Sequence, residues 1–148
     1  MSDALQALYA GETARARELL PADDQLSVFE AAAFGRVARL REIVEERPDE
    51  VNAFSTDGFT PLHLAVFGQT EGAVRILVEH GADVDAVSTA SFAQVTPLGT
   101  AAFVRSLPMA RLLLAAGADP NANDGAARRT AEANADAEMV RLLGGDTE

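Results

Sequence analysis

Several residue types that support common chemistries are missing from this chain. It has no cysteine and no tryptophan, and all 12 of its basic residues are arginine. The lack of cysteine excludes disulfides, zinc–thiolate sites and thiol nucleophiles, and fits a reducing compartment. No apolar run is long enough to span a bilayer, and charged residues interrupt the leucines of residues 1–20. We therefore expect a cytoplasmic protein, and the use of arginine alone indicates a GC-rich, bacterial genome.

Acidic residues strongly outnumber basic ones. The 23 aspartate and glutamate residues give a net charge of −11 at pH 7. Nucleic-acid backbones and anionic membranes both require a positive protein surface. We therefore expect neither as a partner, and a protein partner with an apolar and basic surface fits better. The 148 residues have the length of one domain, so we take residues 1–148 as a single domain and expect a monomer.

One sequence pattern is repeated several times along the chain. Thr60–Ala65 is followed by an apolar stretch at residues 74–78 and by Gly81–Ala86. The same pattern returns 36 residues later from Thr96, and it also occurs 33 residues earlier from Ser27. Repeats of this length are typical of proteins that stack one supersecondary unit many times.

Each copy predicts two helices and a polar hairpin. Thr60 and Thr96 are typical N-caps with proline at the first helical position, and Ser27 with Glu30 has the spacing of a capping box. Asp3 with Gln6 is a looser version of that box. The second helices carry apolar stripes, formed by Leu40, Ile43 and Val44, by Val74, Leu77 and Val78, and by Met109, Leu112 and Leu113. Gly81 and Gly117 follow where a helix ends in a left-handed residue.

The motif Thr60–Ala65, TPLHLA, resembles the T-P-L-H-x-A signature of ankyrin repeats. The resemblance implies an all-α solenoid of four to five helix-turn-helix repeats joined by β-hairpin-like loops. The expected boundaries are 3–23 as a cap, 24–54, 55–87, 88–123, and 124–143 as a short cap. Three extra residues within 87–95 predict a longer hairpin there.

No residue cluster predicts catalysis, a cofactor or a metal site. His63 occupies the signature histidine position, where the resemblance implies hydrogen bonding to hairpin backbone, and His80 lies where a helix C-terminus favours a partly charged imidazole. Asp119–Gly125 begins like a calcium-binding loop, but its glycine is one position late and Thr130 replaces the glutamate ligand. We therefore expect a non-enzymatic protein.

The partner-binding surface is predicted from aromatic residues on the expected concave side, where first helices and hairpins lie. Phe34, Phe67 and Phe103 are separated by 33 and 36 residues and are taken as equivalent. Phe59 and Val95 precede two of the N-caps, and Phe54 and Phe92 lie in hairpins. Exposed aromatic stripes mark interaction sites, whereas the alternative is that the rings fill space between adjacent first helices. The full prediction is Phe34, Phe67, Phe103, Phe59, Val95, Phe54, Phe92, Asp57 and Asp124.

The sequence thus predicts a protein–protein interaction module that binds through a groove of first helices and hairpin tips. An alternative is an acidic inhibitor that mimics nucleic acid and occupies the site of a DNA- or RNA-binding protein. That function requires charges spaced like phosphates, and here the charges are spread over both sides of the expected repeats.

Overall fold

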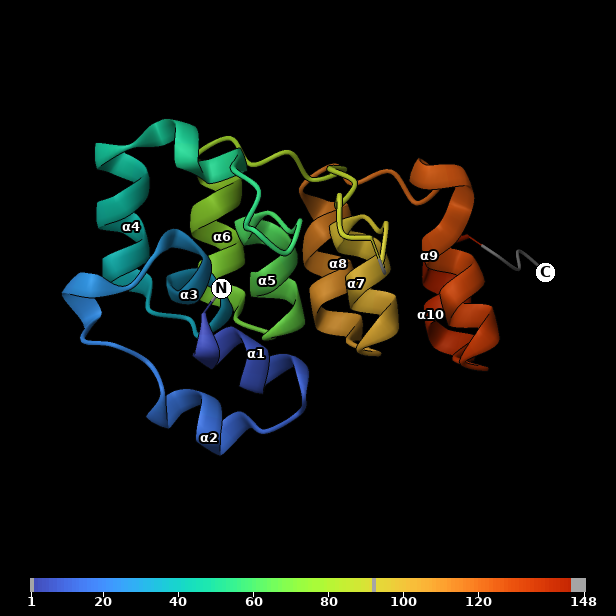
Figure 1. The fold of residues 1–148 in the computed structure, drawn as a ribbon. Helices are drawn as coiled ribbons and strands as arrows, with labels where there is room; N and C mark the ends of the chain where they lie inside the picture. The colour runs from blue at the N-terminus through green and yellow to red at the C-terminus, as the bar shows by residue number, and fades with distance from the viewer. Residues whose placement is uncertain (1, 92, 145–148) are drawn as a thin grey trace. The chain divides into compact units, whose positions relative to one another are not determined.

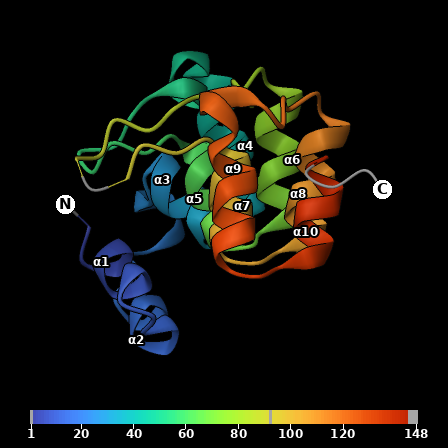
Figure 2. The same cartoon turned by 90° about the vertical axis from the view of Figure 1, so that its right-hand side faces the viewer.

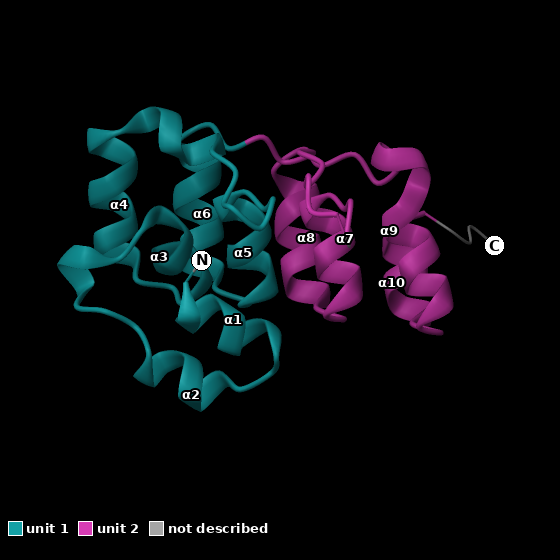
Figure 3. Ribbon diagram, viewed as in Figure 1, with its two compact units in different colours: residues 1–82 teal, residues 83–148 magenta. Residues whose placement is uncertain are grey.

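The computed structural model describes residues 2–91 and 93–144, and within them all regular secondary structure is helical (Figure 1). The described residues add one isolated antiparallel bridge, between Ala90 and Ala93. The all-α prediction is therefore confirmed. None of the helices in these residues has the length and apolar character needed to cross a membrane. The chain divides into two compact units, Met1–Ala82 and Asp83–Glu148 (Figure 3).

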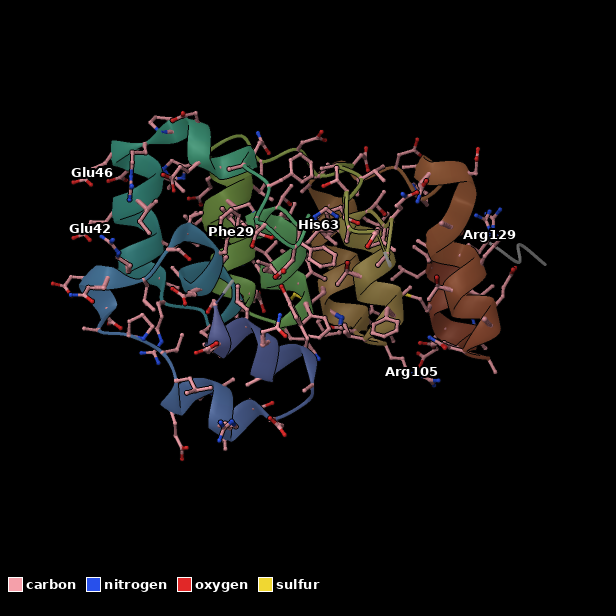
Figure 4. The ribbon with its side chains drawn as sticks, in the orientation of Figure 1. Phe29, Glu42, Glu46, His63, Arg105 and Arg129 are labelled. Carbon is pink, nitrogen blue, oxygen red and sulfur yellow. The ribbon has the colours of Figure 1, made fainter. Side chains whose placement is uncertain are left out.

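Unit 1 consists of two helix pairs packed side by side and a shorter pair before them. Its helices are α1 (Asp3–Tyr9), α2 (Thr13–Glu18), α3 (Val28–Ala33), α4 (Val37–Glu46), α5 (Pro61–Phe67) and α6 (Glu71–Glu79), with 3-10 turns at Asp23–Gln25 and Pro48–Asn52. The first helices α3 and α5 pack on each other, and so do the second helices α4 and α6. Glu42 and Glu46 point outward from α4 (Figure 4).

Unit 2 repeats the same two-layer arrangement. Its helices are α7 (Pro97–Phe103), α8 (Leu107–Ala115), α9 (Ala122–Ala133) and α10 (Ala137–Leu142). First helix α7 packs on α9, and second helix α8 packs on α10. Asn123, Asp124 and Gly125 have left-handed dihedrals inside the bounds of α9, so its regular part begins after them.

In the described residues, all five helix pairs close with the same turn. In every pair an alanine carbonyl of the first helix accepts a bond at 2.9 Å from the backbone N–H five residues later. The donor and acceptor residues are Glu12 and Ala7, Arg36 and Ala31, Thr70 and Ala65, Ser106 and Ala101, and Asp136 and Ala131. The residue before each donor has a positive φ. Gly11 and Gly35 adopt this conformation without strain, whereas Gln69, Arg105 and Ala135 do so despite their side chains.

The predicted helix caps are largely confirmed. Ser27 and Glu30 form a capping box, and the hydroxyl groups of Thr60 and Thr96 accept N–H bonds at the starts of α5 and α7. Gly81 and Gly117 have φ of 92° and 99°. The N-cap of α1 is Ser2 rather than the expected Asp3, because the Ser2 hydroxyl accepts from the Leu5 N–H.

The second helices supply the core that their apolar stripes predicted. In α4, Leu40, Ile43 and Val44 are at most 1% exposed. Leu77 of α6 and Leu113 of α8 are fully buried. Val78 and Leu112 lie at the edges of their stripes and stay partly exposed.

The hairpins that are closed at Ser55 and at Ser88 differ in length as predicted. In unit 1 the Ser55 N–H donates to the Phe59 carbonyl at 2.8 Å, and in unit 2 the Ser88 N–H donates to the Val95 carbonyl at 2.8 Å. The second hairpin therefore encloses three more residues than the first (95 − 88 = 7 against 59 − 55 = 4). In both, the serine hydroxyl also accepts an N–H from the closing residue, Phe59 or Val95.

Candidate partner-binding surface

Phe34, Phe67 and Phe103 are equivalent when counted from their N-caps, as expected, but Phe34 lies one position later when counted from the turn that ends each first helix. Phe67 and Phe103 are the last residues of α5 and α7, whereas Phe34 is the C-cap of α3. The cause is that α3 has 6 residues and α5 and α7 have 7. Counting from the shared turn, the position of Phe67 and Phe103 is held by Ala33 in α3 and by Tyr9 in α1.

Unit 1 gathers its aromatic residues around a small apolar cluster. The buried cluster contains Leu5, Ala7, Leu8 and Ala16 from the first helix pair together with Ala33 and Leu64 from α3 and α5. Tyr9, Phe29, Phe34, Phe59 and Phe67 pack against it and are half-buried. We call the part contributed by the repeats, namely Phe29, Ala33, Phe34, Phe59, Leu64 and Phe67, the first-helix face of unit 1.

Tyr9 lies at the centre of these ring contacts. Its ring is 5.8 Å from that of Phe67 in an edge-on arrangement and 6.1 Å from that of Phe59, which are favourable separations for aromatic pairs. The Tyr9 hydroxyl donates to Asp57 Oδ2 at 3.1 Å. Burial, followed by the charge and hydrogen bond of Asp57, raises the pKa of Tyr9 well above its ordinary value.

A second hydroxyl–carboxylate bond fastens the other end of α1. The Ser2 hydroxyl donates to Glu30 Oε2 at 2.6 Å. Glu30 is only 9% exposed, and its other oxygen, Oε1, accepts the Ser27 N–H of the capping box at 3.1 Å. Both ends of α1 are thus held by carboxylates that belong to the repeats.

The contacts of α1 differ from those of a stacked repeat. A repeat in a stack touches only its neighbours, but Tyr9 reaches Asp57 and Phe59 in the hairpin before α5 and Phe67 at the end of α5. Figure 2 shows α1 near the first helix α3 and away from the second helices α4 and α6, with α2 on the far side of α1. The helix α1 therefore covers the first-helix face of unit 1, and α2 packs on α1.

In unit 2 the corresponding aromatic position is open. Phe103 is 67% exposed, although it ends its helix as Phe67 ends α5. Arg105, two residues on, is also exposed and projects from the end of α7 (Figure 4). Large exposed apolar side chains are informative when they lie on a side that such repeats use for binding.

The hairpin residues of the predicted surface lie in varied environments. Phe54 is 47% exposed, Val95 is half-buried, and Asp57 is engaged by Tyr9. Asp124 is exposed with a φ of 58°, and its carbonyl accepts a bond from Arg129, which Figure 4 shows on α9. Phe92 lies outside the described residues.

Both histidines are engaged in helix capping. His63 is 1% exposed, and its Nδ1 accepts the Thr60 N–H at 3.2 Å, as Glu30 does for Ser27. Figure 4 marks the position of His63 on α5. His80 Nδ1 donates to the Ile76 carbonyl at 2.8 Å at the end of α6. In the described part of the chain, no three histidine, aspartate or glutamate side chains are grouped closely enough to hold a metal ion.

Tyr9 and Phe29 belong to this surface but were not among the residues predicted from the sequence. Tyr9 could have been found by aligning the copies on their turn glycines, since it lies two residues before Gly11 as Ala33 lies two before Gly35. Phe29 gave no comparable signal, because the other first helices have Leu62 and Leu98 at that place after the N-cap.

The repeated turn, the paired helices and the capped first helices define a helical repeat protein. A family model described as ankyrin repeats (3 copies) matches residues 4–124. The chain belongs to the ankyrin repeat family, whose repeats are generally protein–protein interaction modules.

Known relatives share this repeat region only. The chain is 39% identical over 97 residues to the palmitoyltransferase Hip14 of Drosophila melanogaster, which covers 66% of this chain and 15% of that protein. It is 40% identical over 58 residues to ankyrin repeat domain-containing protein 49 of Bos taurus, covering 39% of this chain and 24% of the relative. It is 44% identical over 68 residues to the potassium channel AKT3 of Oryza sativa, covering 41% and 8%. The chain thus spans less than a quarter of the length of each relative.

Proposed function

We propose that this chain is a non-enzymatic module that binds a partner protein through its first helices and hairpins. The observation that carries the proposal is Phe103, a phenylalanine 67% exposed at the end of a first helix. Burying such a ring against a partner would contribute a favourable free energy of about 25 cal/mol for each Å² of apolar surface removed from water. Aromatic anchors of this kind dominate the energy of protein interfaces.

The partner should combine an apolar patch with basic side chains. The chain carries a net charge of −11, and Asp124 is exposed in unit 2 beside Arg129. Complementary charge would mainly accelerate encounter, whereas the apolar contact would set how long the complex lasts.

Affinity capture from an extract, followed by titration of the captured protein, tests this proposal. Phe103→Ser should weaken binding about 30-fold, the equivalent of about 2 kcal/mol for an aromatic anchor. Val37→Ser is the matched control, because Val37 is 38% exposed on the second helix α4 and should leave the affinity unchanged. If both variants bind like the native chain, the proposed surface is wrong.

Salt dependence separates the proposal from nucleic-acid mimicry. An apolar contact with a charged rim should weaken only a few-fold between low and high salt. A captured DNA- or RNA-binding protein whose affinity collapses with salt, and is indifferent to Phe103→Ser, would support the mimic instead.

A further inference from the structure

The first-helix face of unit 1 already binds one helix, α1, and the contacts of α1 show which features a bound helix needs. α1 presents Leu5, Leu8 and Tyr9 on one stripe, with the spacing i, i+3 and i+4 that faces a groove. The exposed residues Asp3, Gln6 and Ala10 lie away from that stripe. The surface is therefore shaped for one side of an amphipathic helix.

Two carboxylates lie at the two ends of the helix that this face binds. Glu30 accepts from Ser2 at 2.6 Å and Asp57 accepts from Tyr9 at 3.1 Å. Ser2 and Tyr9 are seven residues apart (9 − 2 = 7), which corresponds to about 10 Å along a helix. In α1 both donors are neutral hydroxyl groups, whereas a cationic side chain would add an ion pair to the hydrogen bond, and arginine can form two parallel bonds to one carboxylate.

The first helix pair is attached to the rest of unit 1 mainly through one side of α1 and its two carboxylate bonds, and α2 adds little. α1 and α2 have 7 and 6 residues, too short to be stable helices on their own. α2 buries only Ala16, and most of the segment 19–25 that leads to α3 is exposed. Segments with few buried contacts open more readily than the core to which they are attached.

We propose that the first-helix face of unit 1 binds an amphipathic helix of a partner protein that carries basic side chains about seven residues apart, and that the α1–α2 pair is its built-in competitor. This deepens the proposed function and rests on it, since the same kind of surface is used in both units. The tethered pair occupies the face until a helix with stronger end contacts replaces it.

Tethering explains why the partner must have better contacts than α1. A segment joined by a short flexible connection has an effective concentration in the millimolar range. A free helix with the same contacts would therefore compete poorly. The apparent dissociation constant of any partner equals its intrinsic value divided by the fraction of molecules whose face is open.

A peptide titration with the full chain tests the proposal. The probe is a fluorescein-labelled peptide of residues 2–20 carrying Ser2→Arg and Tyr9→Arg, since arginine can both pair with a carboxylate and stack on aromatic rings. The chain variant Leu8→Ser with Tyr9→Ser removes apolar contacts by which α1 binds the first-helix face. It should bind the probe at least about tenfold more tightly than the native chain, because more molecules are open.

Two further variants locate the effect. Ala10→Ser with Arg17→Ser changes exposed positions of the same helix pair and should bind the probe like the native chain. Asp57→Asn, added to the Leu8→Ser, Tyr9→Ser chain, should weaken probe binding about tenfold by removing one end contact. A folded Leu8→Ser, Tyr9→Ser chain that binds the probe no more tightly than the native chain overturns the proposal.

Hydrogen exchange of the native chain tests the opening without any variant. Amides of α1 and α2 should exchange at least about tenfold faster than those of α5, because the cover opens without unfolding the repeats. Equal exchange in α1 and α5 would make the pair a permanent part of the core and refute the proposal. These measurements concern unit 1, so their failure is distinguishable from failure of the Phe103→Ser test in unit 2.

Discussion

The helices α5 and α7 are alike in sequence and capping but differ in what their last residue meets. Both begin with a threonine N-cap followed by proline and end in phenylalanine. Phe67 lies edge-on against Tyr9, while Phe103 is 67% exposed. The same residue at the same repeat position is therefore part of the packing in unit 1 and part of the surface in unit 2. Repeat position alone does not decide whether a side chain stabilises the fold or binds a partner.

The largest expected difference is in the stability effect of replacing these two rings. Phe67→Ser should lower the free energy of unfolding by about 2–3 kcal/mol, less than a fully buried phenylalanine because the ring is half-buried. Phe103→Ser should change it by less than about 0.5 kcal/mol, as exposed substitutions do. Urea denaturation followed by circular dichroism measures both, and equal losses would contradict the comparison.

The next largest effect concerns the residue that follows each phenylalanine. A Cβ on Gly68 would lie 2.0 Å from the Ala33 carbonyl oxygen, so Gly68→Ala should cost about 1–3 kcal/mol through strain between α3 and α5. Val104 is the C-cap of α7 as Gly68 is the C-cap of α5. Val104→Gly therefore makes the opposite substitution at the same repeat position. Thermal melting that leaves Gly68→Ala unchanged would show that α5 can move away from α3.

Alkaline pH should affect unit 1 through Tyr9. Because burial and Asp57 raise its pKa in the folded chain, the neutral phenol contributes stability that is fully present below the unfolded pKa of about 10 and is lost as pH rises above it. Tyr9→Phe should therefore flatten the decline of stability above that pH.

The measurement is simple because the chain has 1 tyrosine and no tryptophan. Phenolate absorbance reports the ionisation of Tyr9 alone. Asp57→Asn is the companion variant, and it should lower the midpoint by removing a negative charge beside the phenol. A native midpoint at the ordinary tyrosine value would mean that the hydroxyl is exposed to water.

The smallest effect should be a gain in stability at the inter-helix turns. Arg105 and Gln69 have φ of 59° and 57° where α3–α4 uses Gly35. Arg105→Gly should stabilise unit 2 by about 0.5–1 kcal/mol, since left-handed backbone costs an L-residue about 1–2 kcal/mol and glycine gives part of this back as chain entropy. A lower melting temperature for Arg105→Gly would show that its side chain makes a compensating contact.

Local features of the fold were predictable from the sequence because each depends on neighbouring residues. The capping box of Ser27 and Glu30 and the left-handed Gly81 and Gly117 depend on backbone geometry within one turn. The longer hairpin ending at Val95 followed from counting residues between two copies. Each of these features is determined by residues close to it in the sequence, and each is present in the structure.

Features that depend on tertiary packing were not predictable in the same way. Phe34 has the expected place after its N-cap but a different place relative to the turn, because α3 closes its turn one residue early, which the N-cap spacing does not reveal. The sequence of α1 matched a repeat well enough to be expected as a cap. Which side of unit 1 it covers depends on how Leu5, Leu8 and Tyr9 fit the face formed by residues far along the chain.

The serine-closed hairpins have a consequence for protein engineering. Ser55 and Ser88 close loops of different length with the same pair of backbone and hydroxyl bonds, so the closure tolerates insertion between its ends. Lengthening a flexible loop costs only about 0.6 kcal/mol for each doubling. The segment between Ser88 and Val95 is thus a natural position for grafting foreign recognition loops, with the helix pairs serving as an unchanged scaffold.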